Sequence, residues 1–199
     1  PIDRHDPAAP PQGLLKNTRF VNFLMIYGFV IFAMYLSQPL TPNFLAGVRD
    51  LTLTETGWIF SAGALGNSVL TLAFSRLNPR RGFILAQLFV ILFAALIWQG
   101  TGLPIFMLGY FLLGGFRAAR PMALAQTREL VHESQMGLSY GSMETVSAII
   151  FIIAPPIAGF IFDRDPYFVY PLSIGLIVVS IIVSYFFPPR KVEEKVPHA

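Results

Sequence analysis

The sequence contains no cysteine and few charged residues. The absence of cysteine excludes disulfides, thiolate metal sites and thiol nucleophiles. The three histidines, His5, His132 and His198, lie far apart in the chain, and their positions predict no metal site. Only 13% of the residues are charged, against about 25% in an average soluble domain. This scarcity of charge argues against a soluble globular domain.

Apolar residues make up 54% of the chain and are concentrated in six long segments. Each segment is long enough to cross the hydrocarbon core of a bilayer, about 30 Å thick, as a helix. The segments cover residues 20–38, 57–75, 82–99, 103–122, 143–162 and 168–187. The sequence therefore predicts an all-α membrane protein with six transmembrane helices. The predicted domains are a linker over 1–19, a six-helix bundle over 20–188 and a tail over 189–199.

The basic residues indicate how the predicted bundle is oriented. Of the 14 Lys and Arg residues, all but Arg49 and Arg164 fall on one side of the predicted membrane. The positive-inside rule places this basic side in the cytoplasm. We therefore expect a multi-pass protein of the cell inner membrane, with both termini and the connecting linker in the cytoplasm.

The chain begins with "PIDRHDPAAPPQG", a Pro/Ala-rich stretch that is typical of a flexible linker. This stretch has neither the charged start nor the apolar run of a signal peptide. A sequence that opens on a linker is expected to be a piece of a longer protein.

Two local signals predict details of individual helices. Thr52, with Glu55 three residues later, predicts a capping box at the start of the second segment. Pro155 and Pro156 lie inside the fifth segment, where proline is expected to kink the helix and free backbone carbonyls.

Pairs of small residues predict close packing between helices. Gly63 and Gly66 lie near the middle of the second segment, and Gly137 and Gly141 lie just before the fifth. Each pair is expected to let a neighbouring helix approach closely.

Several stretches resemble the second half of a transporter of the major facilitator superfamily. They are "GGFRAARPMALAQTRELV", "QMGLSYGSMETVSAIIFIIAPPIAGFIFD" and the basic loop "SRLNPRRG". The resemblance implies a twelve-helix protein of which this chain is the last six helices, arranged as a 3+3 inverted repeat. The loop departs from the family pattern, because Ser75 stands at the usual aspartate position and Asn78 at the usual glycine position.

Polar residues inside the apolar segments are candidates for the substrate pathway, because a polar group in lipid is costly unless it meets a partner or a wet cavity. In the family fold the first of these helices lines the central cavity. The candidates are Tyr27, Tyr35, Gln38, Asn67 and Tyr110. The alternatives are membrane-interface anchoring for the tyrosines, hydrogen bonding to a neighbouring helix for Asn67, and an aromatic core for Tyr110.

Charged residues near the basic end of the fourth and fifth segments form a second candidate set. Arg117 and Arg120 lie on one side of a helix, and Glu144 lies at a similar depth on the next, antiparallel segment. An ion pair between Arg120 and Glu144 would belong to a charge network at an inner gate, which could also include Glu129. The alternatives are snorkelling to lipid phosphates and binding of an anionic substrate.

No catalytic triad, phosphate loop or paired buried carboxylates appear in the segments, so no enzyme activity and no cofactor is expected. The sequence has no basic run interleaved with aromatic residues, the pattern typical of a nucleic-acid-binding segment, so nucleic acid is not an expected partner.

The leading hypothesis is membrane transport of a small solute by alternating access, in a secondary active carrier that could be a proton-coupled exporter. The partners would be the bilayer, the solute, and an N-terminal six-helix half or a second copy. The alternative is a six-helix scaffold or assembly factor that transports nothing.

Overall fold

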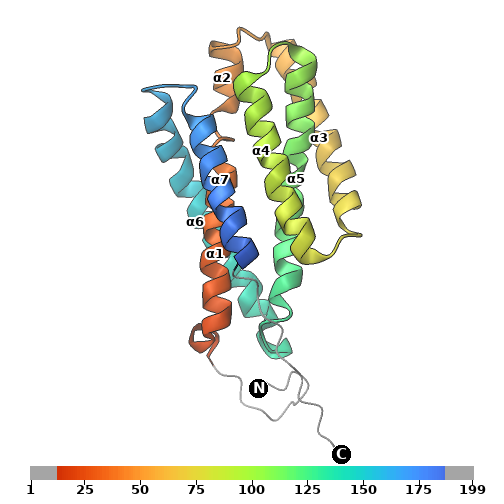
Figure 1. Cartoon of the computed structure of the whole chain (residues 1–199), viewed down its shortest axis with the longest axis vertical. Coiled ribbons are helices and arrows are strands. Elements are labelled where there is room, and N and C mark those ends of the chain that lie inside the picture. Colours follow the sequence, from red (N-terminus) through yellow and green to blue (C-terminus); the bar gives the residue numbers. More distant parts are fainter. Residues whose placement is uncertain (1–12, 187–199) are drawn as a thin grey trace, which may run out of the picture.

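The computed structural model describes residues 13–186, which form a bundle of long helices that run along one common direction (Figure 1). The end of the bundle that holds the first residues of α1 is called the inner end, following the predicted orientation, and the opposite end is the outer end. The long helices are α1 (Thr18–Tyr35), α3 (Leu53–Phe74), α4 (Pro79–Gln99), α5 (Leu103–Thr127), α6 (Met136–Phe162) and α7 (Val169–Phe186). The short elements are η1 (Leu14–Lys16), α2 (Thr41–Gly47) and η2 (Glu133–Gln135).

Five of the long helices are long and apolar enough to cross a membrane: α1, α3, α4, α6 and α7. Helix α5 is the longest of the described helices after α6, but it is less apolar than these five, because Arg117 and Arg120 lower its mean hydropathy. The all-helical membrane fold is therefore confirmed, while the sixth crossing and the inverted repeat stay predictions. The predicted N-terminal linker overlaps the described chain only from residue 13, where η1 and the first two residues of α1 lie, and the tail over 189–199 lies outside the described residues.

Helix ends follow the local sequence. The predicted capping box is confirmed at α3, where the Thr52 side chain accepts from the Glu55 backbone N–H and the Glu55 carboxylate accepts from the Thr52 N–H. Asn17 and Asn78 cap α1 and α4 through their side-chain oxygens. Helix α5 extends five residues beyond the predicted end at Met122, because the residues that follow are buried against neighbouring helices.

Helices α3, α4 and α5 pack against one another so closely that glycine is required at the contacts. A Cβ at Gly66 of α3 would run into the backbone of Phe111, and one at Gly114 of α5 would run into the backbone of Gly66 and Asn67. The predicted close packing at Gly66 is thus confirmed. The prediction for Gly137 and Gly141 is wrong within the described chain, because a Cβ at either position would meet no atom within 4 Å.

Helices α1, α6 and α7 form a second group, held by buried hydroxyl groups. The hydroxyls of Tyr27 on α1 and Ser147 on α6 lie 2.8 Å apart, and Ser173 on α7 donates to the carbonyl of Ala33 on α1 at 2.9 Å. Helix α7 also packs against α4, where Ser180 Oγ donates to Gln87 Oε1 at 2.6 Å. Helix α7 therefore joins the two groups.

At the outer end, Arg49 holds several connections together. Its guanidinium donates to the carbonyl of Trp98 at 2.6 Å and to that of Ile97 at 3.3 Å, at the carboxyl end of α4. The same group lies over three aromatic rings from different elements. These rings are Phe44 at 5.3 Å, Tyr167 at 5.6 Å and Phe106 at 5.8 Å. The short helix α2, which the sequence analysis did not predict, is thereby fixed over the ends of α4 and α5.

Candidate functional site

A cavity of about 540 Å³ lies between the two helix groups, with walls from α1, α3, α5 and α6 and from the residues that follow α1. Four of the five residues predicted for the substrate pathway line this one cavity: Tyr35, Gln38, Asn67 and Tyr110. They come from segments far apart in the sequence, and the fold brings them together. Such a convergence of polar groups in a largely apolar hollow is typical of a small-molecule site.

Two neighbouring helices, α3 and α5, line this cavity with a similar spacing of residues. On α3 the lining residues are Phe60, Gly63, Ala64 and Asn67, and on α5 they are Tyr110, Leu113, Gly114, Phe116 and Arg117. Apart from Phe116, the residues on each helix fall at i, i+3, i+4 and i+7, which is one face of an α-helix. The glycines on these faces also keep the two backbones close.

Aromatic rings form much of the remaining surface. Tyr35 lies against Phe151 of α6, with ring centroids 4.6 Å apart, and stacks on Phe116 of α5 at 6.0 Å. Phe60 lies 5.5 Å from Tyr110. Phe60, Phe116 and Phe151 were not predicted from the sequence, because phenylalanine is common in apolar segments whether it faces lipid, core or cavity.

The polar groups at the cavity are two amides, two phenols and one guanidinium. The Gln38 amide donates to the carbonyl of Met34 at 2.7 Å, which leaves its oxygen free to accept. Tyr110 is 7% exposed and packs edge-on against Phe93 at 5.5 Å, so it serves both the predicted cavity surface and the alternative aromatic core. None of the residues that line this cavity is acidic.

Tyr27 does not line the cavity in this structure. Its side chain is 1% exposed, and its hydroxyl bonds Ser147 across the α1–α6 contact. The side chain of Ser147 also donates to the carbonyl of Met143 at 3.0 Å. A substrate contact for Tyr27 therefore stays a prediction, and its observed contacts are those of a residue that joins two helices.

The charged residues continue inward from the cavity. Arg117 lines the cavity, and Arg120, one turn further along α5, forms an ion pair with Glu144 of α6. The two side chains are 54% and 44% exposed. Within the described chain, no ion pair joins Glu129 to Arg117 or Arg120.

A second contact between α5 and α6 lies at the carboxyl end of α5. Arg128 Nε donates to the hydroxyl of Tyr140 on α6 at 3.0 Å. This hydrogen bond raises the pKa of Arg128, so the group stays charged. Together with Arg120 and Glu144, it joins the inner ends of α5 and α6.

Two further features concern the predicted proline kink in α6 and possible metal ligands. Helix α6 runs as one continuous helix through Pro155 and Pro156, so a change of direction there stays a prediction. Over residues 13–186 no three acidic or histidine side chains come close enough together to hold a metal ion.

Apolar helices packed around a cavity with polar and aromatic walls are features of a multi-pass membrane protein. The profile of the Major Facilitator Superfamily matches residues 23–199, and the chain belongs to this superfamily. The chain is also similar to the raffinose permease of Escherichia coli, with 26% identity over 191 residues. This similarity covers 87% of the chain but only 44% of that permease. The chain thus spans less than half the length of this relative.

Proposed function

We propose that this chain is one six-helix half of a secondary active carrier, which moves a small solute across the membrane by alternating access. The observation that carries the proposal is the meeting of Tyr35, Gln38, Asn67 and Tyr110 at one cavity. In such carriers the solute site lies near the bilayer midplane between two bundles that rock about it. The second bundle would correspond to the part of the raffinose permease that this chain does not match. A second copy of this chain is the alternative partner.

The cavity favours a neutral, polyhydroxylated solute such as an oligosaccharide. The faces of Tyr35, Phe116 and Phe151 offer flat apolar surfaces, and the C–H faces of sugar rings pack well against such surfaces. The amides of Gln38 and Asn67 and the guanidinium of Arg117 would bind hydroxyl groups. The name of the raffinose permease agrees with this solute class.

The ion pair between Arg120 and Glu144 would position the inner wall of the cavity. Both partners belong to this half, so the pair holds α5 against α6 and, through α5, fixes Arg117 at the cavity. A carrier that opens inward must move this wall relative to the other bundle. We therefore propose that the ion pair stabilises the position of α5 and α6 at the inner gate.

The proposed energy source is a proton gradient, used for export or for uptake. No acidic residue lines the cavity of this chain, so the carboxylate that couples protons to solute would lie in the other half. The carrier would lie in the cell inner membrane with both termini in the cytoplasm, since 12 of the 14 basic residues fall on that side.

The test is solute flux in proteoliposomes that contain the full-length protein. Labelled raffinose is the first probe, followed by a panel of mono- and disaccharides, with and without an imposed pH gradient. The proposal predicts saturable flux that responds to the gradient, and the direction of flux distinguishes export from uptake. A stable complex with another membrane protein, without flux of any solute, would favour the scaffold function instead.

A further inference from the structure

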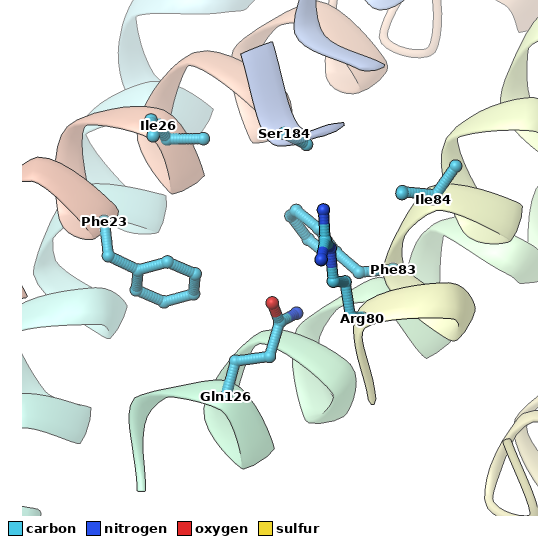
Figure 2. A pocket seen from close by; sticks show the side chains of 7 residues that line it. All are labelled: Phe23, Ile26, Arg80, Phe83, Ile84, Gln126 and Ser184. Carbon is cyan, nitrogen blue, oxygen red and sulfur yellow. The ribbon is translucent and has the colours of Figure 1, made fainter. Parts of the chain in front are cut away.

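A small recess at the inner end lies apart from the solute cavity, between α1, α4, α5 and α7 (Figure 2). Its apolar walls are Phe23 and Ile26 of α1 and Phe83 and Ile84 of α4. Three polar side chains complete the lining: Arg80, Gln126 and Ser184. Figure 2 shows the guanidinium of Arg80 and the amide of Gln126 directed into the same space, below Ser184.

The polar side chains of this recess can form more hydrogen bonds than they make within the described chain. Ser184 is 8% exposed, and its Oγ is buried without a hydrogen-bond partner in the described chain. Gln126 uses its amide nitrogen on the carbonyls of Met122 and Pro79, at 3.3 and 3.4 Å, which leaves its oxygen able to accept. Arg80 donates to the carbonyl of Tyr185 at 2.8 Å and keeps further N–H groups. A buried hydroxyl without a partner is costly, so a ligand here is favoured.

The size of the recess limits what can enter its deepest part. The volume of about 10 Å³ is about that of one water-sized sphere. A single oxygen atom that accepts from Arg80 and Ser184 would fill it. The remainder of the ligand must lie at the mouth, beside the exposed part of Arg80.

The position of the recess indicates the source of that oxygen. In Figure 1, α4 and α7 end short of α1 and α5 at the inner end, so the recess lies beneath the end of α7 and beside the start of α4. The mouth is basic, because Arg80 lines the recess from the first turn of α4, and Arg81 follows it on the same exposed turn. Helix amino ends and arginine both favour phosphate. Basic pockets between transmembrane helices on the cytoplasmic side are typical sites for anionic lipid headgroups.

From these observations we propose that the recess binds the headgroup of an anionic phospholipid. One phosphate oxygen enters between Arg80 and Ser184, the polar end of the headgroup donates to Gln126, and the acyl chains leave along the apolar wall formed by Ile26 and Ile84. The bound lipid joins the inner ends of α4 and α7, where α7 connects the two helix groups. This site does not depend on which solute the carrier moves.

The test measures which lipids remain bound to the full-length protein. The protein is placed in nanodiscs of phosphatidylcholine with a minor share of phosphatidylglycerol, extracted, and its bound lipid is counted by mass spectrometry. We expect phosphatidylglycerol to be enriched on the native protein. Arg80→Gln should lower that enrichment about fivefold, as expected for the loss of one direct hydrogen-bond donor to the bound phosphate. Arg80→Lys should retain most of it, because an ammonium group still binds phosphate.

The matched control is Arg76→Gln, which removes the same charge from the same connection but does not line the recess. We expect little change in bound phosphatidylglycerol for this variant. An equal loss in Arg76→Gln and Arg80→Gln would overturn the site, as would equal retention of phosphatidylcholine and phosphatidylglycerol by the native protein. Ser184→Ala is a milder second variant in case Arg80→Gln does not fold, and unchanged enrichment in it would also contradict the site.

A further arm separates lipid from free phosphate. Millimolar inorganic phosphate is added to the nanodiscs before extraction. The proposal predicts that bound phosphatidylglycerol is not displaced, since its acyl chains add apolar contact. Displacement would identify the recess as a site for phosphate from solution and would overturn the assignment to lipid.

Discussion

Arg120 on α5 and Glu144 on α6 form an ion pair one helical turn inward from Arg117, which lines the cavity. The pair is about half exposed, so its contribution to stability is small, at most about 1 kcal/mol. Its position next to the cavity wall matters more than its energy. Loss of the pair is expected to leave the bundle folded and, under the proposed gating role, to slow the movement of this wall relative to the other bundle.

The first prediction concerns this pair. Glu144→Gln in the full-length protein should slow solute transport about fivefold, which corresponds to about 1 kcal/mol in the rate-limiting conformational step. Arg120→Gln should have a similar effect, and the double variant should be no slower than either single one, because both remove the same contact. Initial rates in proteoliposomes measure this. An unchanged transport rate in Glu144→Gln would exclude a role of the ion pair in the inner gate.

The second prediction concerns the crossing of α3 and α5. Gly66→Ala should lower the free energy of unfolding by about 1–3 kcal/mol, because its Cβ would run into the backbone of Phe111. Gly137→Ala is the matched control, since its Cβ meets no atom within 4 Å and alanine favours a helix. Thermal melting in detergent compares the two variants. Equal melting temperatures would show that the helices are not packed as described.

The third prediction separates two tyrosines on α1. Tyr27→Phe removes the hydroxyl that bonds Ser147 and should cost about 1 kcal/mol of stability without changing KM for the solute. Tyr35→Phe keeps the ring against Phe116 and Phe151 but removes a hydroxyl at the cavity, so KM should rise with little change in melting temperature. Transport kinetics and melting curves measure both. A rise of KM in Tyr27→Phe would instead support a substrate contact for that residue.

The fourth prediction concerns the outer end. Arg49→Lys should destabilise the protein by about 1–3 kcal/mol, because lysine loses the paired hydrogen bonds to Ile97 and Trp98 and the planar contact with aromatic rings. Arg164→Lys is the control, since Arg164 is exposed and lies over one ring, Phe160. Melting temperature measures the difference. A similar small shift in both variants would contradict a structural role for Arg49.

Much of the fold was predictable because membrane helices leave strong local signals. The apolar segments and the Thr52–Glu55 capping box depend on neighbouring residues only; the capping box is confirmed, and five of the six segments lie in helices long and apolar enough to cross a membrane. The amino-terminal prolines of α4 and α5 also lie where helices can accept them. Helix α2 was missed because Arg49 connects its Phe44 to two rings that are distant in the sequence, Phe106 and Tyr167, a contact that no local pattern contains.

The site was predictable only in part. Polar residues inside apolar segments stand out, and four of those selected do meet at the cavity. The same criterion also selected Tyr27, because a sequence does not indicate whether a buried hydroxyl has a partner such as Ser147 on another helix. The aromatic lining was missed because its residue type is common in every environment of a membrane helix.

If this cavity is the solute site, bound solute should shield its walls from small reagents, and site-directed alkylation measures that shielding. The chain has no cysteine, so Asn67→Cys can be introduced into the full-length protein after any cysteines elsewhere are replaced. Ser68→Cys is the control, since the adjacent Ser68 does not line the cavity. The rate of reaction with a small thiol reagent is measured with and without the solute that the flux experiment identifies, beginning with raffinose. We expect solute to slow the reaction of Asn67→Cys and to leave that of Ser68→Cys unchanged; equal rates at Asn67→Cys with and without solute would show that the solute binds elsewhere.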